Sequence, residues 1–413
     1  MKSAAALDTV PRRVTLAFLL VRGCSSAAYF TLLPFLGLWL LQTRGMSGAA
    51  GGTVVAGCLL FGRTGGLLVS RLVTALGLRR SVLVAYVTAT STLLAMLGYP
   101  GHSLPVWLLL AAVLGLSFSA ATAALKALVA AAYSAEQRLR GFSHLNLAVN
   151  AGSALGSAAG GAVLTHWPGL LPLAGVVLYL GATISALLLP RPVARPTGAA
   201  PEVPGAGPTL RPFVVFLLVT SLTWVAYAQV FEVLPTYVAD SLDPQQVSLL
   251  FVANAVLIII LQTPVTAVVQ RLRARHPRMC ALGLLPGAHL VMALSMVLFG
   301  ALLGSPVSVG YAGILLFTLA EVVWGPMYDA EIEEVRGRLS SVTAYSAAGL
   351  AWGTAESAGT WLGMAVVTVT GLSWQVTAGM YWLSATGLVA VAGYFAVRSR
   401  GAMRTTEHAR VDV

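Results

Sequence analysis

The chain has 413 residues, of which 57% are hydrophobic and only 9% are Asp, Glu, Lys or Arg. An ordinary soluble domain carries about 25% charged residues, so a soluble globule of this composition lacks the charge to cover its surface. The net charge is +11, but no basic face is set against a soluble core, which argues against nucleic-acid binding. The composition predicts an integral membrane protein that crosses a lipid bilayer many times.

Twelve apolar segments follow one another along the chain, separated by Gly, Pro and charged residues. Each has about 20 residues or more, the length that crosses roughly 30 Å of hydrocarbon. Their predicted bounds are 14–41, 48–71, 80–99, 104–133, 142–164, 169–189, 212–239, 245–270, 279–303, 307–329, 339–370 and 375–397. The first follows Arg12 and Arg13 and is too long for a signal peptide, so we expect it to be a span.

The basic residues predict the orientation of the chain. All of them except Arg22, Arg44, Arg63 and Lys126 lie at the N-terminus, in the even-to-odd loops, in a central linker or in the C-terminal tail. Lys and Arg gather on the cytoplasmic side of membrane proteins. We therefore expect both termini to lie in the cytoplasm and the protein to reside in the cell (inner) membrane.

A proline-rich segment divides the spans into two sets of six. Its sequence, RPVARPTGAAPEVPGAGPTLRP, cannot form a span and predicts a semi-rigid tether. We expect an N-terminal six-helix bundle at 1–190, a cytoplasmic linker at 191–211, a C-terminal six-helix bundle at 212–397 and a cytoplasmic tail at 398–413.

The two halves repeat several features in the same order, at offsets between 196 and 201 residues. The pairs are Leu33-Pro34 with Leu234-Pro235, Arg71-Leu72 with Arg271-Leu272, Arg140-Gly141 with Arg336-Gly337, and Gly152 and Gly156 with Gly349 and Gly353. Repeats in the same orientation are typical of secondary transporters that bind substrate between their halves. The predicted fold is all-α, with two six-helix bundles related by a pseudo-twofold axis.

Three local patterns point to a particular family. The second segment ends in Gly66 and Arg71, followed by Gly77, Arg79 and Arg80; the fifth contains Asn150, Gly152, Gly156 and Gly160; the tenth contains Glu321 before Pro326. These patterns resemble motifs of the major facilitator superfamily, and most of all its bacterial drug:proton antiporter group. Ser70 and Ser157 stand where the family motifs have Asp and Pro. The resemblance implies a carrier that works by alternating access.

The glycine pattern of the fifth segment has two interpretations. Glycine at every fourth position lets a neighbouring helix approach closely. Such a stripe suits the surface where two moving halves meet, but it also suits static packing of any membrane helix. The sequence leaves both open.

Six ionisable residues lie inside the segments, and each costs at least about 2.5–3.5 kcal/mol to insert, so each is a functional candidate. The bases Arg22, Arg63 and Lys126 belong to the first half, and the acids Glu232, Glu321 and Glu356 belong to the second. Charges of opposite sign in opposite halves attract one another when the halves close, so these residues predict a gate between the halves. By depth along its span, Lys126 matches Glu321, although its long side chain could also reach the inner interface. For proton coupling we expect Glu321 first and Glu356 second.

These patterns favour a secondary active transporter, with proton-coupled export of small amphipathic compounds such as drugs or metabolites as the expected function. The alternative is a proton-coupled importer of a sugar, amino acid or peptide. The sequence contains no recognisable catalytic or nucleotide-binding motif, and Cys24, Cys58 and Cys280 have no metal-site spacing, so we expect neither enzyme activity nor a cofactor. The expected partners are a small-molecule substrate, protons and the bilayer, with a monomer as the functional unit.

Overall fold

The computed structural model describes residues 11–133, 138–190, 210–275, 277–303, 305–337, 339, 341–369 and 373–411. The predicted linker at 191–211 therefore lies almost wholly outside the described residues. Throughout these described ranges the regular structure is helical, without a strand. The all-α prediction is confirmed.

The helices reproduce the predicted segments to within a few residues at most boundaries. The N-terminal half contains α1 (Arg12–Arg44), α2 (Gly48–Leu76), α3 (Leu78–Gly98), α4 (Leu104–Ala132), α5 (Arg138–His166) and α6 (Leu171–Ala186), with a short turn η1 (Pro168–Leu170) before α6. The C-terminal half contains α7 (Arg211–Ala228), η2 (Gln229–Val233), α8 (Leu234–Tyr237), α9 (Pro244–Arg275), α10 (Pro277–Gly300), α11 (Val307–Val335), α12 (Ser341–Val367) and α13 (Trp374–Val411). Together, α7, η2 and α8 make the predicted seventh segment.

Among the described residues, ten helical segments are long and apolar enough to cross a membrane. Helices α2 and α12 are not among them, and both are rich in Gly, Ala, Ser and Thr. The protein is thus a multi-pass helical membrane protein, while the count of twelve spans remains a prediction. Many large apolar side chains are exposed, for example Leu68, Leu155 and Leu383, as expected of helices that face lipid.

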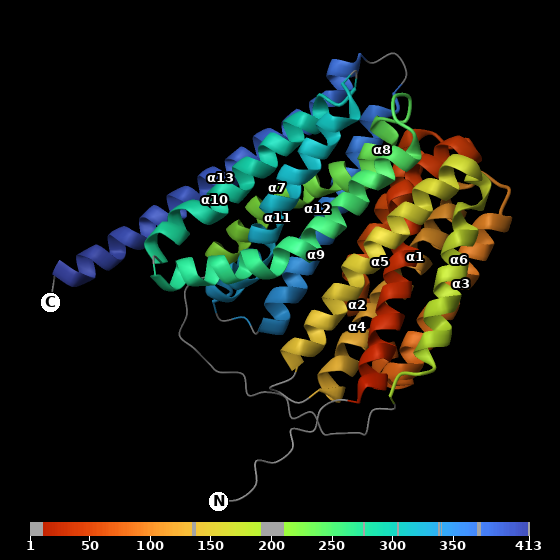
Figure 1. Ribbon diagram of the computed structural model, residues 1–413, viewed down its shortest axis with the longest axis horizontal. Helices are drawn as coiled ribbons and strands as arrows, with labels where there is room; N and C mark the ends of the chain where they lie inside the picture. The colour runs from red at the N-terminus through yellow and green to blue at the C-terminus, as the bar shows by residue number, and fades with distance from the viewer. Residues whose placement is uncertain are drawn as a thin grey trace, which may run out of the picture.

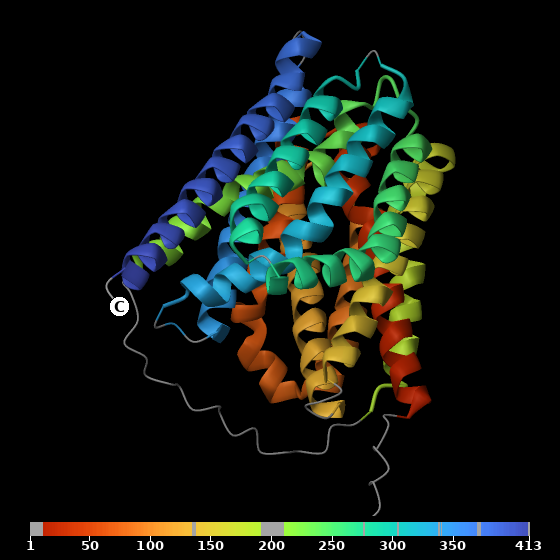
Figure 2. The same ribbon diagram turned by 60° about the vertical axis from the view of Figure 1, so that its left-hand side comes forward.

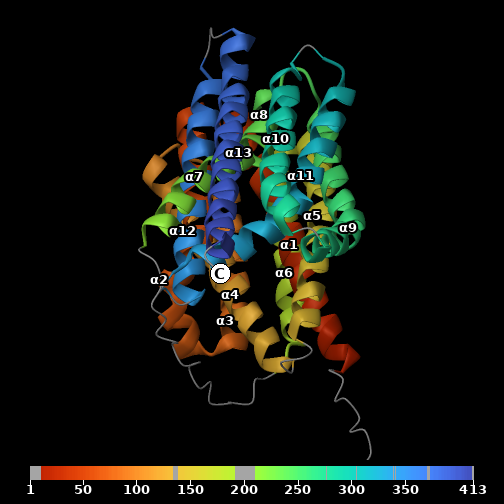
Figure 3. The ribbon, with the colours of Figure 1, turned by 90° about the vertical axis from the view of Figure 1, so that its left-hand side faces the viewer.

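The helices form two groups, α1–α6 and α7–α13 (Figure 1). Within the first group, α1 packs on α5 and α6, and α2 packs on α4; within the second, α10 packs on α11 and α13, and α7 packs on α12. The pair α10 and α13 faces the viewer in Figure 3. The most extensive contacts between the groups are those of α2 with α12 and of α5 with α9, and α1 also touches η2 and α8. These two seams position the candidate site.

The molecule has two ends, which we name by the helix termini that lie there. The terminal end holds the start of α1 and of α7, and the distal end holds the corners between α1 and α2, α5 and α6, and α8 and α9. The two groups lie close together at the distal end and diverge toward the terminal end (Figures 1 and 2).

One helix extends far beyond its predicted end, and another is bent. Helix α13 continues to Val411, so most of the predicted C-terminal tail extends the last helix. Helix α9 contains Pro264 and bends in its second half (Figure 1). A proline removes one backbone hydrogen bond and its ring clashes with the preceding turn, which accounts for such a bend.

Candidate functional site: a charged pair between the two halves

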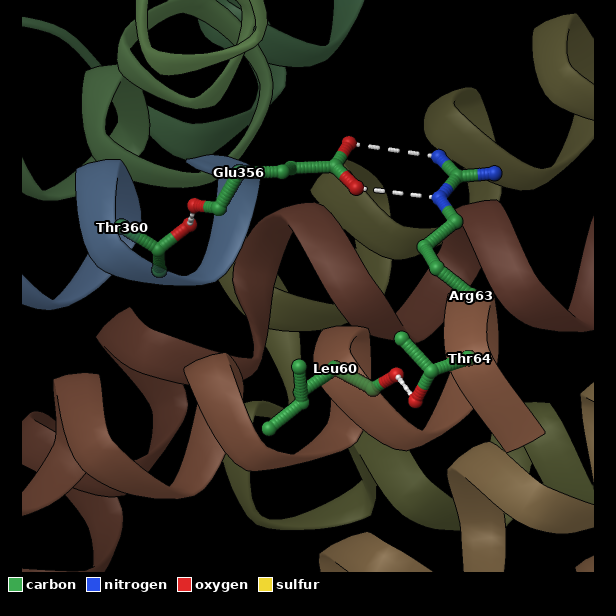
Figure 4. A network of polar contacts seen from close by, with 5 residues as sticks. All are labelled: Leu60, Arg63, Thr64, Glu356 and Thr360. Carbon is green, nitrogen blue, oxygen red and sulfur yellow. Dashed lines mark hydrogen bonds and ion pairs between the residues drawn. The ribbon is translucent and has the colours of Figure 1, made fainter. Parts of the chain in front are cut away.

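Arg63 of α2 and Glu356 of α12 form an ion pair that joins the two halves. The Arg63 Nε donates to Glu356 Oε2 at 2.9 Å, and Nη2 donates to Oε1 at 3.2 Å (Figure 4). The Glu356 side chain is 4% exposed and that of Arg63 is 26% exposed. Two parallel charge-assisted hydrogen bonds fix both distance and orientation. The pair lies where α2 and α12 pack together.

The residues around the pair hold it in place. Gly353, next to Trp352 on α12, gives Arg63 room, because a Cβ there would lie 2.7 Å from the Arg63 Cβ. The Arg63 guanidinium lies 3.9 Å from the centre of the Trp352 ring. That ring in turn stacks on Trp224 of α7, with centroids 4.0 Å apart. A cation–π contact on a supported ring stabilises the arginine.

Glu232 provides a second carboxyl group beside this pair. It is buried, its Oε2 has no hydrogen-bond partner among the described residues, and it interacts electrostatically with Glu356 and Arg63. It sits in the wide turn η2, where the N–H of Leu234 donates to the carbonyl of Gln229. Pro235 follows directly; proline cannot donate in a regular helix, and single wide turns of this kind are frequent at functional sites.

Glu321, the first sequence candidate for proton coupling, lies in a different environment. Its carboxylate accepts a hydrogen bond of 3.0 Å from Asn254 of α9, which also donates to Thr318 at 2.9 Å. Tyr227 of α7 interacts with Glu321 as well. All these partners belong to the C-terminal half. Lys126 is exposed on α4, and its pairing with Glu321 stays a prediction.

Arg22 of α1 faces the same region from the N-terminal half. Its Nη1 donates to Thr122 of α4 at 3.1 Å, and its guanidinium lies 5.7 Å from the centre of the Phe118 ring. Phe118 stacks on Tyr29 at 4.3 Å. The structure therefore brings Arg22, Arg63, Glu232 and Glu356 to one region.

The loop motif lies within the N-terminal half. Gly77 has a φ of +80° at the corner between α2 and α3, a conformation that favours glycine. The Arg79 guanidinium donates to the carbonyl of Leu187, just after α6, at 2.5 Å. Arg71 and Arg80 are exposed, and Gly66 lies in α2. The motif thus ties the start of α3 to the end of α6.

The glycine stripe of α5 packs within one half. A Cβ on Gly152 would lie 2.5 Å from the carbonyl oxygen of Gly23, and a Cβ on Gly156 or Gly160 would overlap the backbone of Ala27 or Thr31, all on α1. Asn150 donates to the carbonyl of Asn146 at 3.1 Å, one turn earlier in α5. Of the two interpretations, the stripe follows static packing and not the surface between the halves.

The sequence analysis missed the contacts that join the halves at the distal end. The Thr165 hydroxyl on α5 donates to Asp243 Oδ1 at 2.7 Å, immediately before α9. Gly161, outside the predicted stripe, lies against Ser248 of α9, and Gly48 of α2 lies against Thr368, just after α12. Asp243 and Gln246 bracket the start of α9 in a helix-capping pattern, a signal that predicts a helix start but no partner.

Comparison with known proteins agrees with this architecture. A sequence profile for the family described as the Major Facilitator Superfamily matches residues 18–359. No curated protein sequence matches the chain. Among solved structures, the POT family transporter PepTSo is 14% identical, with a TM-score of 0.72 over 95% of this chain and 99% of its own. A peptide transporter POT in complex with alafosfalin is 14% identical, with a TM-score of 0.75 over 93% of both chains. The nucleoside transporter NupG is 14% identical, with a TM-score of 0.71 over 92% of this chain and 98% of its own.

Proposed function

Because the chain belongs to the Major Facilitator Superfamily, we propose that it exports a small amphipathic compound by alternating access while protons move in the opposite direction. The fold supports secondary transport; the coupling ion, the direction and the substrate are the proposal. The proposal also takes the protein to work as a monomer in the cell membrane, without a cofactor or an enzymatic step.

One observation supports proton coupling above the others: the Arg63–Glu356 ion pair joins the halves that must move. Removing one partner of a buried ion pair leaves an uncompensated charge, which is strongly destabilising. The pair therefore resists separation while both groups are charged. A proton on Glu356 removes one of the charges and lets α2 and α12 part, so proton binding and the transport step become linked.

The other two carboxyl groups have different roles in this proposal. Glu232 lies beside the pair and provides a second position for the proton when Glu356 changes partner. Glu321 binds Asn254 within its own half, so its proton does not act directly on the contact between the halves. We therefore place Glu356 before Glu321 as the coupling group, which reverses the order predicted from the sequence.

Proteoliposomes with an imposed pH gradient test the proposal. The fluorescent dyes rhodamine 6G and fluorescein serve as amphipathic probes of opposite charge. Glu356→Gln should abolish gradient-driven movement of the transported probe, while exchange without a gradient survives. Asp240→Asn, a change at an exposed carboxylate near the distal end, is the matched control and should transport normally.

Two results would count against this assignment. Undiminished gradient-driven transport by Glu356→Gln together with its loss in Glu321→Gln would transfer the coupling role to Glu321. Undiminished transport by both variants would show that the carrier is not coupled to protons through these groups.

The proposed direction of transport rests on the resemblance of the α5 glycine pattern to the antiporter motif. Vesicles of known sidedness decide the direction, because a proton-coupled exporter moves the probe in the direction opposite to the proton flow. Accumulation in the same direction as the protons would establish the importer instead.

A further inference from the structure

Arg22 is a half-buried cation with most of its hydrogen-bonding capacity unused. A guanidinium group has five N–H donors, and the described contacts engage one of them, with Thr122. The guanidinium carbon lies over the ring of Phe118, 5.7 Å from its centre. Within the described residues, an arginine at this depth keeps a charge that the protein itself does not neutralise.

The intramembrane carboxylates are occupied elsewhere. Glu356 binds Arg63, Glu321 binds Asn254, and the electrostatic partners of Glu232 are Glu356 and Arg63. The groups that act electrostatically on Arg22 are three tyrosines, including Tyr29, and the like charge of Arg63. Two guanidinium groups thus lie near each other in the N-terminal half, and both carboxylates of this region, Glu356 and Glu232, act on Arg63.

We infer that Arg22 and Arg63, together with Tyr29, bind the anionic group of the transported compound, which is an amphipathic organic anion such as an aromatic carboxylate or sulfonate. Tyr29 interacts electrostatically with both arginines, and its hydroxyl can donate to an anion. Its ring, stacked on Phe118, offers an apolar surface to the body of the compound. This inference rests on the proposed transport function and names its substrate class.

The site also links the substrate to the ion pair. An anion that binds Arg63 competes with Glu356 for the same guanidinium donors, since Arg63 holds Glu356 through Nε and Nη2. The anion and Glu356 therefore exclude one another at Arg63, which links substrate binding to the contact that joins the halves.

Dye binding to the purified protein in nanodiscs tests the inference. Fluorescein is anionic and rhodamine 6G is cationic at neutral pH, and both carry the same xanthene ring system. Fluorescence polarisation should show fluorescein binding to the native protein. Arg22→Gln should weaken it by about tenfold or more, because a charge-assisted hydrogen bond is lost. Arg22→Lys should recover part of the affinity, and Arg12→Gln, the same change at an exposed arginine on the same helix, should have no effect.

A second variant separates binding from folding. Glu356→Gln removes the competitor for Arg63, so it should bind fluorescein more tightly than the native protein does. A damaged fold cannot produce a gain in affinity. Absence of fluorescein binding, equal binding by Arg22→Gln, or weaker binding by Glu356→Gln would each overturn the inference.

The inference and the proposed function can fail separately. Gradient-driven transport of rhodamine 6G without fluorescein binding would leave proton coupling intact and remove the anion site. Fluorescein binding with the expected variant pattern, but without gradient-driven transport, would leave the anion site intact and remove proton coupling.

Discussion

At the scale of single residues, Asp243 shows how one carboxylate can join a helix start to the opposite half. It accepts hydrogen bonds from the Thr165 hydroxyl and from the Gln245 backbone N–H, both at 2.7 Å. These two bonds hold the pKa of the Asp243 carboxyl below its ordinary value, with a smaller contribution in the same direction from His166. The ionised form therefore stabilises the distal contact.

We predict that this contact survives mild acidification. A carboxyl group whose pKa is lowered by folding contributes stability above its unfolded pKa, about 3.9 for Asp, and loses that contribution as the pH falls through the folded pKa. In a His166→Gln background, the difference in thermal unfolding midpoint between the protein and its Asp243→Asn variant should stay constant from pH 8 to about pH 4. It should shrink only at lower pH. A difference that disappears near neutral pH would contradict the assignment.

Arg44 is the one basic residue that the sequence analysis leaves outside both the spans and the predicted cytoplasmic segments. Its Nη2 donates to the carbonyls of Met96 and Leu97 at the end of α3, at 3.1 and 2.7 Å. The group also lies 4.9 Å from the centre of the Trp39 ring. A cation at a helix C-terminus satisfies carbonyls that have no helical partner. Arg44 thus has a structural reason to lie at the distal end.

The sequence identified the charged residues of the site but not how they pair. The cost of a charge inside the membrane singled out Arg63 and Glu356 without any coordinates. The position of a residue along a helix, however, fixes only its depth in the membrane and leaves open which way its side chain points. Lys126 and Glu321 match in height, yet the first is exposed and the second binds Asn254. Pairing depends on how helices of different halves face each other, which local sequence does not encode.

At the scale of helices, the bounds were predictable because apolar length and Gly, Pro or charged breaks determine them locally. The wide turn η2 was not predictable, although Pro235, which causes it, was visible in the sequence as the repeat partner of Pro34. Pro34 lies inside an unbroken α1, whereas Pro235 follows a break in the seventh span. The same residue type gives different local structures in the two halves because the surrounding packing differs.

Two glycines in opposite halves, one tightly packed and one not, should respond differently to the same substitution. Gly156 touches the backbone of Ala27, whereas a Cβ on Gly349 of α12 meets nothing within 4 Å. Gly156→Leu should therefore destabilise the folded protein by about 1–3 kcal/mol or more, because it overpacks a helix contact inside one half. Gly349→Leu should fold normally. Thermal unfolding of the two purified variants checks this.

Transport assays on the same two variants test whether Gly349 lies on a surface that closes during transport. Gly349 lies on α12 one turn closer to the terminal end than Gly353, which contacts Arg63 of the opposite half. If the terminal end closes during the cycle, leucine at 349 obstructs it, and this variant should fold but transport poorly. Equal stability of the Gly156 and Gly349 variants would show that the α5 stripe is not a packing contact.

At the scale of the whole molecule, the positive residues predict which end faces the cytoplasm. A reporter that is active only in the cytoplasm should be active when fused within 195–208 and silent when fused near Gly101, in the corner between α3 and α4. The reverse pattern would invert the membrane orientation and the direction of transport that we propose. Fusions at both positions in the same host provide the internal control.

The contacts between the halves define the conformational state of the molecule. Thr165 with Asp243, Gly161 with Ser248 and Gly48 with Thr368 all lie at the distal end. The Arg63–Glu356 pair lies deeper, and Gly349 beyond it faces open space. Taking the terminal end as cytoplasmic, this arrangement is closed to the outside, and alternating access requires the distal contacts to separate during each cycle.

Locking these distal contacts should therefore stop transport. Thr165→Cys and Asp243→Cys, combined in a chain whose Cys24, Cys58 and Cys280 are replaced by alanine, place two thiols where a 2.7 Å hydrogen bond now joins the halves. A short reducible bifunctional thiol reagent should link them, abolish probe transport in proteoliposomes, and permit its recovery after reduction. Each single-cysteine variant, treated in the same way, should keep transporting, because a reagent attached to one half alone does not join it to the other. Full transport by the linked protein would mean that the distal end does not open, and that the halves do not move as alternating access requires.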